Sequence, residues 1–307
     1  MKWIEAKVTF TPDLSETTED LIANIFDELG IKGVIIEQPN WDKEVDWADH
    51  DIHQPNLNSV TGFFPNSEQA IQLKDALNYR LEQLKREHPF TFQLEYKIID
   101  EANWAESWKS YFFPQKISKF IVVKPTWCDY TQQPNDIVVE IDPGMAFGTG
   151  THATTMLCVQ MIEKYVKAGD RLLDIGTGSG ILMIAAAKLG AAQVHGVDID
   201  PMAITIAENN LVLNKIPKDC FYLWVGDMIR PISMQYDIVV ANILHEPILI
   251  LLKSIKTVLC KNAIVIVSGI IQDKKELILN EMKHQHLDII DLCEEQEWVA
   301  ISARFGI

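Results

Sequence analysis

The sequence lacks the features that would place the chain in or across a membrane. None of its apolar runs reaches the length of about 20 residues that a helix needs to span a bilayer. The first residues, Met1 to Glu5, do not combine a basic segment with a following apolar one, as a secretory signal peptide does. We therefore expect a cytoplasmic protein with no membrane association.

Cysteine is scarce and scattered. No two cysteines form a C-x-x-C pair, and their number is odd, which suits neither a zinc site nor a disulfide framework. We therefore expect buried free thiols and no bound metal. The five cysteines are Cys128, Cys158, Cys220, Cys260 and Cys293.

Basic residues are outnumbered. The chain has 27 Lys and Arg against 43 Asp and Glu, a formal net charge of −16. Nucleic-acid binding requires a basic face, so we expect no direct DNA binding. A strong negative charge favours association with a cationic partner. A merely acidic soluble protein would have the same balance, so charge alone leaves both interpretations open.

The chain is long enough for two domains, and its first part has its own pattern. Alternating apolar strands are expected at 2–10, 33–37, 60–64 and 90–96, with helices at 19–29 and 67–87. This β-α-β-β-α-β order predicts a small ferredoxin-like α+β domain over residues 1–97. It contains no catalytic constellation, so we expect it to recognise the substrate. A linker helix is expected at 98–115, where Trp104 and Trp108 are spaced as packing residues of a helix.

Residues 116–307 alternate strands with helices. Strands are expected at 120–123, 137–141, 171–176, 192–198, 220–225, 236–242 and 263–267, and helices at 156–165, 180–190, 201–213, 247–259 and 273–285. Such alternation predicts an α/β, Rossmann-like domain with a mostly parallel sheet. The last two strands, 287–293 and 297–305, have no helix between them and predict a closing hairpin with one antiparallel strand.

The stretch from Arg171 to Ile181 predicts a nucleoside site. A short apolar strand enters three glycines at alternate positions, and an apolar helix follows whose first N–H groups lack helical partners. Asp198 ends the next strand about twenty residues after the first glycine, where an acid accepts hydrogen bonds from ribose hydroxyls. The third glycine is one place too early for the dinucleotide motif G-x-G-x-x-G. G-x-G-x-G is more typical of S-adenosylmethionine sites, whereas a helix–strand turn without a ligand remains an alternative.

A second polar loop precedes this strand. Residues 142–155, DPGMAFGTGTHATT, hold three glycines and four threonines and lead into an apolar helix. Hydroxyls and N–H groups at a helix start suit a carboxylate or an adenosyl group, although an elaborate N-cap is the structural alternative.

The carboxyl ends of the predicted parallel strands also carry polar residues and a glycine. Because ligands bind at these ends, we expect one cleft to be lined by Asp174, Gly176, Asp198, Asp227 and Asn242.

Over nearly its full length the chain resembles the bacterial methyltransferases that modify the eleventh protein of the large ribosomal subunit. The 142–155 loop is close to the family's D-P-G-x-A-F-G-T-G-T-H-x-T-T, with Ala153 where proline is usual, and Asn242-Ile243-Leu244 matches its N-I-L. His245-Glu246 departs from the small residues usual there. The resemblance implies a class I methyltransferase whose cofactor, S-adenosylmethionine, is held by Thr155, Gly176, Asp198 and Asn242. It also implies that lysine and N-terminal amines of the ribosomal protein are trimethylated.

Methyl transfer to a lysine requires a neutral amine. A lysine ammonium has no lone pair and must lose its proton before attack, and desolvation beside a cationic cofactor lowers the amine pKa. Asn242 is therefore the expected catalytic residue, because its side-chain carbonyl can accept from the amine without repelling it. We interpret His152 as a hydrogen bonder within its loop, His195 as a satisfied histidine and Asp174 as a brace for the glycine turn. Asp227 is a candidate partner for the adenine amino group.

We expect a monomer. Three other functions are compatible with parts of the sequence. A nicotinamide oxidoreductase is disfavoured by the early third glycine and the closing hairpin. A methyltransferase for RNA or a small molecule is disfavoured because N-I-L lacks the aromatic residue that stacks on planar amines. A binding module without catalysis is the third.

Overall fold

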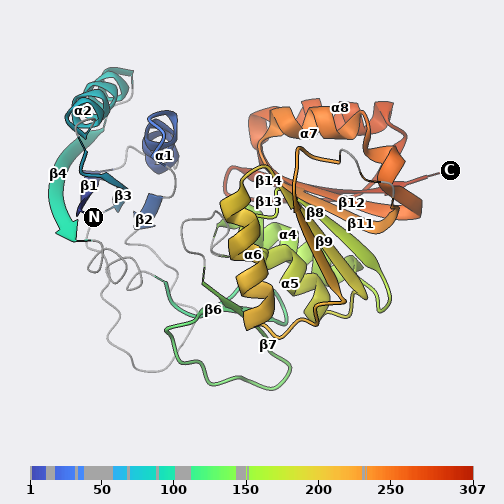
Figure 1. Cartoon of the computed structure of the whole chain (residues 1–307). Helices are drawn as coiled ribbons and strands as arrows, with labels where there is room; N and C mark the ends of the chain where they lie inside the picture. The colour runs from blue at the N-terminus through green and yellow to red at the C-terminus, as the bar shows by residue number, and fades with distance from the viewer. Residues whose placement is uncertain are drawn as a thin grey trace. The chain divides into compact units, whose positions relative to one another are not determined.

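The chain forms two compact units, Met1–Phe112 and Phe113–Ile307, each described by itself (Figure 1). The computed structural model describes residues 2–11, 18–31, 34–37, 58–67, 70–87, 90–100, 112–142, 150, 152–229, 232 and 234–306.

The first unit has the predicted ferredoxin-like arrangement. Its elements are β1 (Lys2–Thr11), α1 (Thr18–Glu28), β2 (Val34–Glu37), β3 (Asn58–Pro65), α2 (Ala70–Glu87) and β4 (Thr91–Asp100). The sheet order is β2-β3-β1-β4, and every neighbouring pair is antiparallel. Alternate residues of β1, from Ile4 to Phe10, are buried in a core with Phe26 and Leu81, which is why the polar–apolar alternation predicted this strand.

The predicted linker helix at 98–115 is wrong at both ends. Strand β4 continues to Asp100 because it pairs with the whole of β1, from Thr11↔Thr91 to Lys2↔Asp100. At the other end, Gln115–Lys116 forms strand β5. The predicted packing role of Trp104 and Trp108 lies outside the described residues.

The second unit begins with a small sheet of β5, β6 (Ile121–Pro125) and β7 (Ile137–Ile141). The last two are the strands expected at 120–123 and 137–141, and they pair in parallel.

A seven-stranded sheet dominates this unit. Its order is β10-β9-β8-β11-β12-β14-β13, and β14 alone runs against its neighbours. The predicted hairpin with one antiparallel strand is therefore confirmed. The strands are β8 (Arg171–Ile175), β9 (Gln193–Asp198), β10 (Phe221–Val225), β11 (Tyr236–Asn242), β12 (Leu259–Ile271), β13 (Leu287–Glu295) and β14 (Trp298–Phe305).

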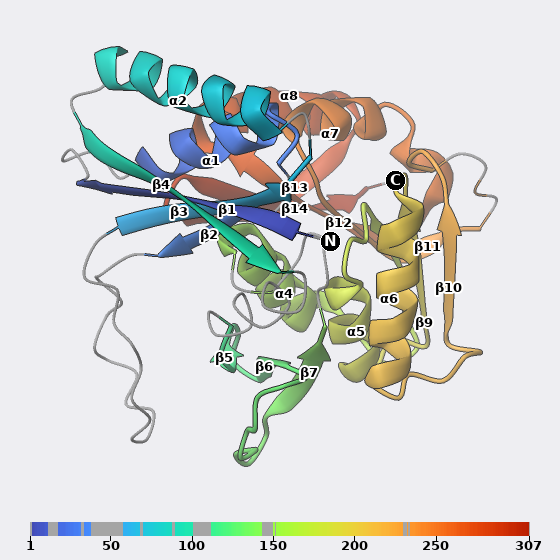
Figure 2. The same cartoon turned by 60° about the vertical axis from the view of Figure 1, so that its left-hand side comes forward.

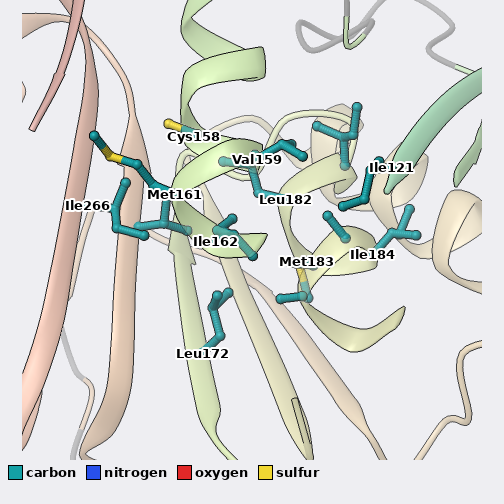
Figure 3. Close-up of a cluster of buried hydrophobic side chains, with 14 of the residues drawn as sticks. Ile121, Cys158, Val159, Met161, Ile162, Leu172, Leu182, Met183, Ile184 and Ile266 are labelled. Atoms are coloured by element: carbon teal, nitrogen blue, oxygen red, sulfur yellow. The ribbon is translucent and has the colours of Figure 1, made fainter. Parts of the chain in front are cut away.

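Helices cover both faces of this sheet (Figures 1 and 2). One face packs on α4 (Ala153–Tyr165), α5 (Ile181–Lys188) and α6 (Pro201–Leu213), and the other on α7 (His245–Leu252) and α8 (Lys275–His284). Successive strand residues enter opposite cores, so that Leu172 lies in the first and Leu173 in the second. Figure 3 shows the first core, where Leu172 lies among side chains of α4 and α5. Burial on both faces explains why these strands are continuously apolar in sequence.

Several predicted boundaries were wrong where a neighbour decides them. Helix α4 begins at Ala153, three residues early, because the His152 side chain caps it. Strand β12 extends from Leu259 to Ile271 to pair with β14 as far as Ile271↔Trp298. The helix predicted at 247–259 therefore ends at Leu252, and a 3-10 turn, Ile255–Val258, precedes β12. A second 3-10 turn, Gln272–Lys274, precedes α8.

All five cysteines lie in the described part of the chain and are free thiols, although only Cys158 is fully buried. Among the described residues, no helix is long and apolar enough to cross a bilayer. No group of three or more potential metal ligands occurs in the same part of the chain.

Candidate cofactor and amine site

Three neighbouring strands bring the predicted residues to one edge of the sheet. Strands β9, β8 and β11 lie side by side, and their carboxyl ends carry Asp198, Gly176 and Asn242. Carboxyl ends of parallel strands form the binding edge of such sheets. The site is therefore built by the topology of the sheet.

The glycine turn adopts backbone conformations that other residues disfavour. Gly176, Gly178 and Gly180 have φ values of 73°, 52° and 80°. The Gly176 and Thr177 N–H groups donate to the Val197 carbonyl at 2.9 and 3.1 Å, which ties the turn to β9. A Cβ on Gly176 would lie 2.4 Å from Cγ2 of Ile243, so no side chain fits between the turn and the end of β11.

Asp198 is held by backbone groups on both oxygens. Its Oδ2 accepts from the Gly178 N–H at 2.9 Å, and its Oδ1 accepts from the Asp200 N–H at 3.0 Å. Each carboxylate oxygen has a further lone pair, and the side chain is only half-buried. The arrangement presents a fixed, partly exposed acceptor beside the glycine turn, as ribose hydroxyls require. Asp227 is exposed at the same edge, one residue after Gly226, whose N–H donates to the Asp198 carbonyl at 2.9 Å.

Asn242 is linked to the first turn of α4. Its Nδ2 donates to Oγ1 of the buried Thr155 at 3.3 Å. This bond orients the amide so that Oδ1 is available to accept from an amine.

His152 organises the turn that carries Thr155. Its Nδ1 accepts from the Thr154 N–H at 3.3 Å and lies 2.7 Å from Thr154 Oγ1. The ring meets Trp298 edge to face, with centroids 5.1 Å apart. Burial lowers the pKa of His152, which favours the neutral ring that a cap acceptor requires. Its geometry is that of the hydrogen bonder expected from sequence. Residues 143–149 and 151 of the same loop lie outside the described residues.

Asp174 lies under the turn and does not face outward. It is fully buried, and Thr177 Oγ1 donates to its Oδ2 at 2.8 Å. No described residue donates to its Oδ1. Burial raises the pKa of Asp174 to about 7, opposed by the Thr177 hydrogen bond and assisted by the charge of Asp198. This geometry is that of a brace for the glycine turn.

Two other histidines have partners of their own. His195 is buried, with Nδ1 2.9 Å from the Tyr236 hydroxyl, and burial lowers the pKa of His195. His245 Nδ1 lies 3.2 Å from a carboxylate oxygen of Glu246, its neighbour in sequence.

Some residues that hold the loops were not predicted from the sequence. Buried Asn210 in α6 donates to the Ser179 carbonyl and accepts from the Asp142 N–H, both at 2.9 Å. It thereby joins the base of the 142–155 loop to the glycine turn. The available signal was the spacing of two asparagines four residues apart, Asn210 in α6 and Asn214 at its C-terminal cap, both of which are buried. Gly269 in β12 was also missed and makes a close contact with Ile243.

The residues present fit an adenosyl cofactor. The turn offers backbone where a Cβ would intrude, and a fixed carboxylate and an oriented amide stand beside it. Thr155, Gly176, Asp198 and Asn242 are thus brought together through direct contacts among neighbours.

Comparison with known proteins gives a family match over nearly the whole chain. Residues 2–305 match the profile of the family described as ribosomal protein L11 methyltransferase (PrmA). Proteins named ribosomal protein L11 methyltransferase from Desulfosudis oleivorans and Alkaliphilus oremlandii are each 40% identical, and each alignment covers 99% of both chains. A crystal structure of the ribosomal protein L11 methylase from Lactobacillus delbrueckii subsp. bulgaricus is 31% identical with a TM-score of 0.61, covering 64% of this chain and 100% of that one.

Proposed function

Because the chain belongs to the ribosomal protein L11 methyltransferase (PrmA) family, we propose that it methylates amines of ribosomal protein L11. Membership makes it an enzyme that depends on S-adenosylmethionine. The observation that carries the proposal is the joint placement of Asn242 and Thr155 beside the glycine turn, at the edge that carries Asp198.

The four residues would divide into two pairs in cofactor binding. The backbone at Gly176 and the Asp198 carboxylate would hold the adenosine portion, and Thr155 and Asn242 would hold the rest of the cofactor. The cofactor supplies an electrophilic methyl group, so the protein must bind and orient.

Asn242 is proposed to orient the nucleophile. Its Oδ1 accepts a hydrogen bond from a neutral amine and directs the lone pair toward the methyl group. A lysine amine has an unperturbed pKa of about 10.4, and desolvation lowers it toward neutrality. The described histidines near the edge already have partners, His152 in Thr154 and His245 in Glu246. Because desolvation favours the neutral amine, a dedicated general base is not required.

The residues after Asn242 suit an aliphatic amine. Ile243 and Leu244 follow it, and Leu244 is 62% exposed. Neither residue can stack on a planar base as an aromatic one would, whereas both can contact the methylene stem of lysine. We propose lysine side chains and the N-terminal amine as substrates, each carried to the trimethylated state.

The first unit is proposed to recognise the substrate protein. It forms a complete ferredoxin-like sheet and contains none of the cofactor residues. The net charge of −16 would accelerate capture of a basic ribosomal protein, so the association rate should fall with added salt. A chain starting at residue 103 should still bind S-adenosylmethionine and scarcely methylate intact L11. If that chain folds by circular dichroism and methylates L11 at the full rate, the recognition role is wrong.

Intact mass spectrometry tests the function directly. Purified enzyme, S-adenosylmethionine and L11 should give methyl additions to L11, and peptide mapping should place them on lysine and the N-terminus. A control reaction replaces L11 with ribosomal RNA. Methylation of RNA with unmodified L11 would overturn the proposal.

We further propose that the protein is a cytoplasmic monomer. A molecular mass equal to that of a dimer, measured by light scattering, would contradict the monomer.

A further inference from the structure

Ile243 lies between two glycines from different strands. On one side a Cβ at Gly176 would meet its side chain, with Cγ2 at 2.4 Å. On the other side a Cβ at Gly269 would meet its backbone, with the carbonyl oxygen at 2.2 Å, the carbonyl carbon at 2.8 Å and the nitrogen at 3.1 Å. The residue that follows Asn242 is therefore enclosed from both directions.

A β-bulge brings Gly269 to this place. Between the pairs Val267↔Ile301 and Ile270↔Val299, two residues of β12 oppose one residue of β14. Gly269 occupies the bulge with φ of 84°, a left-handed conformation that side chains disfavour. The preceding residue, Ser268, pairs with Asn242, and its carbonyl accepts from the Ile243 N–H at 3.2 Å.

The two contacts differ in what could relieve them. A side chain can rotate away or be trimmed, so a Cβ at Gly176 could be accommodated by a smaller residue at 243. A backbone carbonyl cannot be trimmed. A Cβ at Gly269 would therefore push the peptide that follows Ile243, and Asn242 is one residue away on the same short segment.

We propose that Gly269 is a positioning residue: by admitting the Ile243 backbone into the bulge of β12, it sets where the Asn242 amide stands. The inference rests on the proposed role of Asn242 in orienting the amine. Small displacements of a positioning group cost rate because the reacting atoms must be aligned within about an ångström.

The first test compares Gly269→Ala with Gly169→Ala. Gly169 has φ of 94° and nothing within 4 Å of its would-be Cβ, so both variants introduce the strained backbone but only one introduces the collision. We expect Gly269→Ala to lower kcat roughly 10- to 100-fold. Its affinity for S-adenosylhomocysteine, measured by calorimetry, should fall much less than kcat, because Asp198 still supplies its contact to the adenosine portion of the ligand. Gly169→Ala should match the wild type in both.

The second test asks whether Gly269 acts through Asn242. If it does, Gly269→Ala added to Asn242→Ala should cause no further loss of kcat, because residues that act as a unit are not additive. A multiplicative loss in the double variant, or a folded Gly269→Ala enzyme with wild-type kcat, overturns the inference and leaves the proposed function intact. Wild-type turnover by Asn242→Ala overturns the proposed role of Asn242 and the inference together.

Should Gly269→Ala fail to fold by circular dichroism, Ile243→Ala applies the same test without the collision. The shorter side chain removes the packing of Ile243 against Gly176, which frees the Asn242–Ile243 segment to move. We expect kcat to fall with S-adenosylhomocysteine affinity retained, and with no further loss in the Asn242→Ala background. Unchanged kcat in this variant contradicts the inference.

Discussion

The seven-stranded sheet has an amino end and a carboxyl end, named after the ends of its parallel strands that lie there. Polar groups at these two ends differ in whether they have acceptor capacity left for a ligand. Toward the amino ends of the parallel strands, polar groups pair with each other: the His195 ring with the Tyr236 hydroxyl at 2.9 Å, and the backbone N–H of Arg171 with Asp237 Oδ2 at 2.9 Å. At the carboxyl end, Asp198 and Asn242 are fixed by neighbours yet half-exposed, with acceptor capacity left over.

The glycines at the two ends of the parallel strands also differ, in how closely other residues approach them. Gly169 and Gly190, at the amino end, have positive φ and no would-be Cβ contact closer than 3.7 Å, so they serve the reversal of the chain. Gly176 and Gly269 have positive φ and would-be Cβ contacts of 2.4 and 2.2 Å with Ile243. A positive φ alone therefore does not distinguish the glycines beside Ile243, whereas the short distance from a would-be Cβ to Ile243 does.

The largest effect should come from Asn242, at the carboxyl end. Asn242→Ala removes the acceptor that orients the amine, so kcat should fall roughly 10³-fold, or about 4 kcal/mol of transition-state stabilisation. Calorimetry should show a much smaller loss in affinity for S-adenosylmethionine. Equal losses in turnover and affinity would reduce Asn242 to a cofactor contact.

Asp198→Ala should act on binding. It removes an acceptor fixed by two backbone N–H groups, and S-adenosylmethionine affinity should fall by roughly 2–4 kcal/mol, as for hydrogen bonds to a charged group. A folded variant with wild-type affinity in calorimetry would rule out the ribose assignment.

Asp174 should act on stability in a pH-dependent way. Its folded pKa of about 7 exceeds the ordinary value of 3.8, so the folded state binds the extra proton between these values. Its contribution to stability is therefore fully present below about pH 4 and is lost as pH rises through 7. Relative to Asp174→Asn, the wild type should lose roughly 2–4 kcal/mol of unfolding free energy across this window. Urea melts of both proteins at several pH values test this, and parallel stability curves would contradict it.

The smallest effect should come from a substitution at the amino ends of the parallel strands, Tyr236→Phe. Tyr236→Phe leaves buried His195 without its hydroxyl partner and should cost about 1 kcal/mol of stability. Both kcat and S-adenosylmethionine affinity should match the wild type. A loss of affinity in this variant would show that the two ends are not separate in function.

The sequence predicted elements best where local signals agree. Strand β11 at 236–242 and helix α6 at 201–213 have the predicted bounds, because an apolar run ends in Asn242 and Asp200-Pro201 marks a helix start. The placement of Gly176, Asp198 and Asn242 at one edge of the sheet was predicted, because the carboxyl ends of neighbouring parallel strands meet there.

What the sequence did not predict depends on partners far along the chain. The length of β12 is decided by β14, and the end of β4 by β1. An isolated glycine in an apolar strand indicates a bulge, which was a usable signal for Gly269. Its neighbour Ile243 is 26 positions earlier, and only the folded sheet brings the two together.

Hydrogen exchange with and without S-adenosylhomocysteine compares the two ends of the sheet in one experiment. We expect the ligand to protect the backbone amides of 176–180, 198–200 and 242–244, at the carboxyl ends of the parallel strands. Amides of 167–171 and 234–237, at the amino end, should exchange at the same rate with and without ligand. Protection confined to the amino end, or unchanged exchange at 176–180 under saturating ligand, would contradict the assignment of the site.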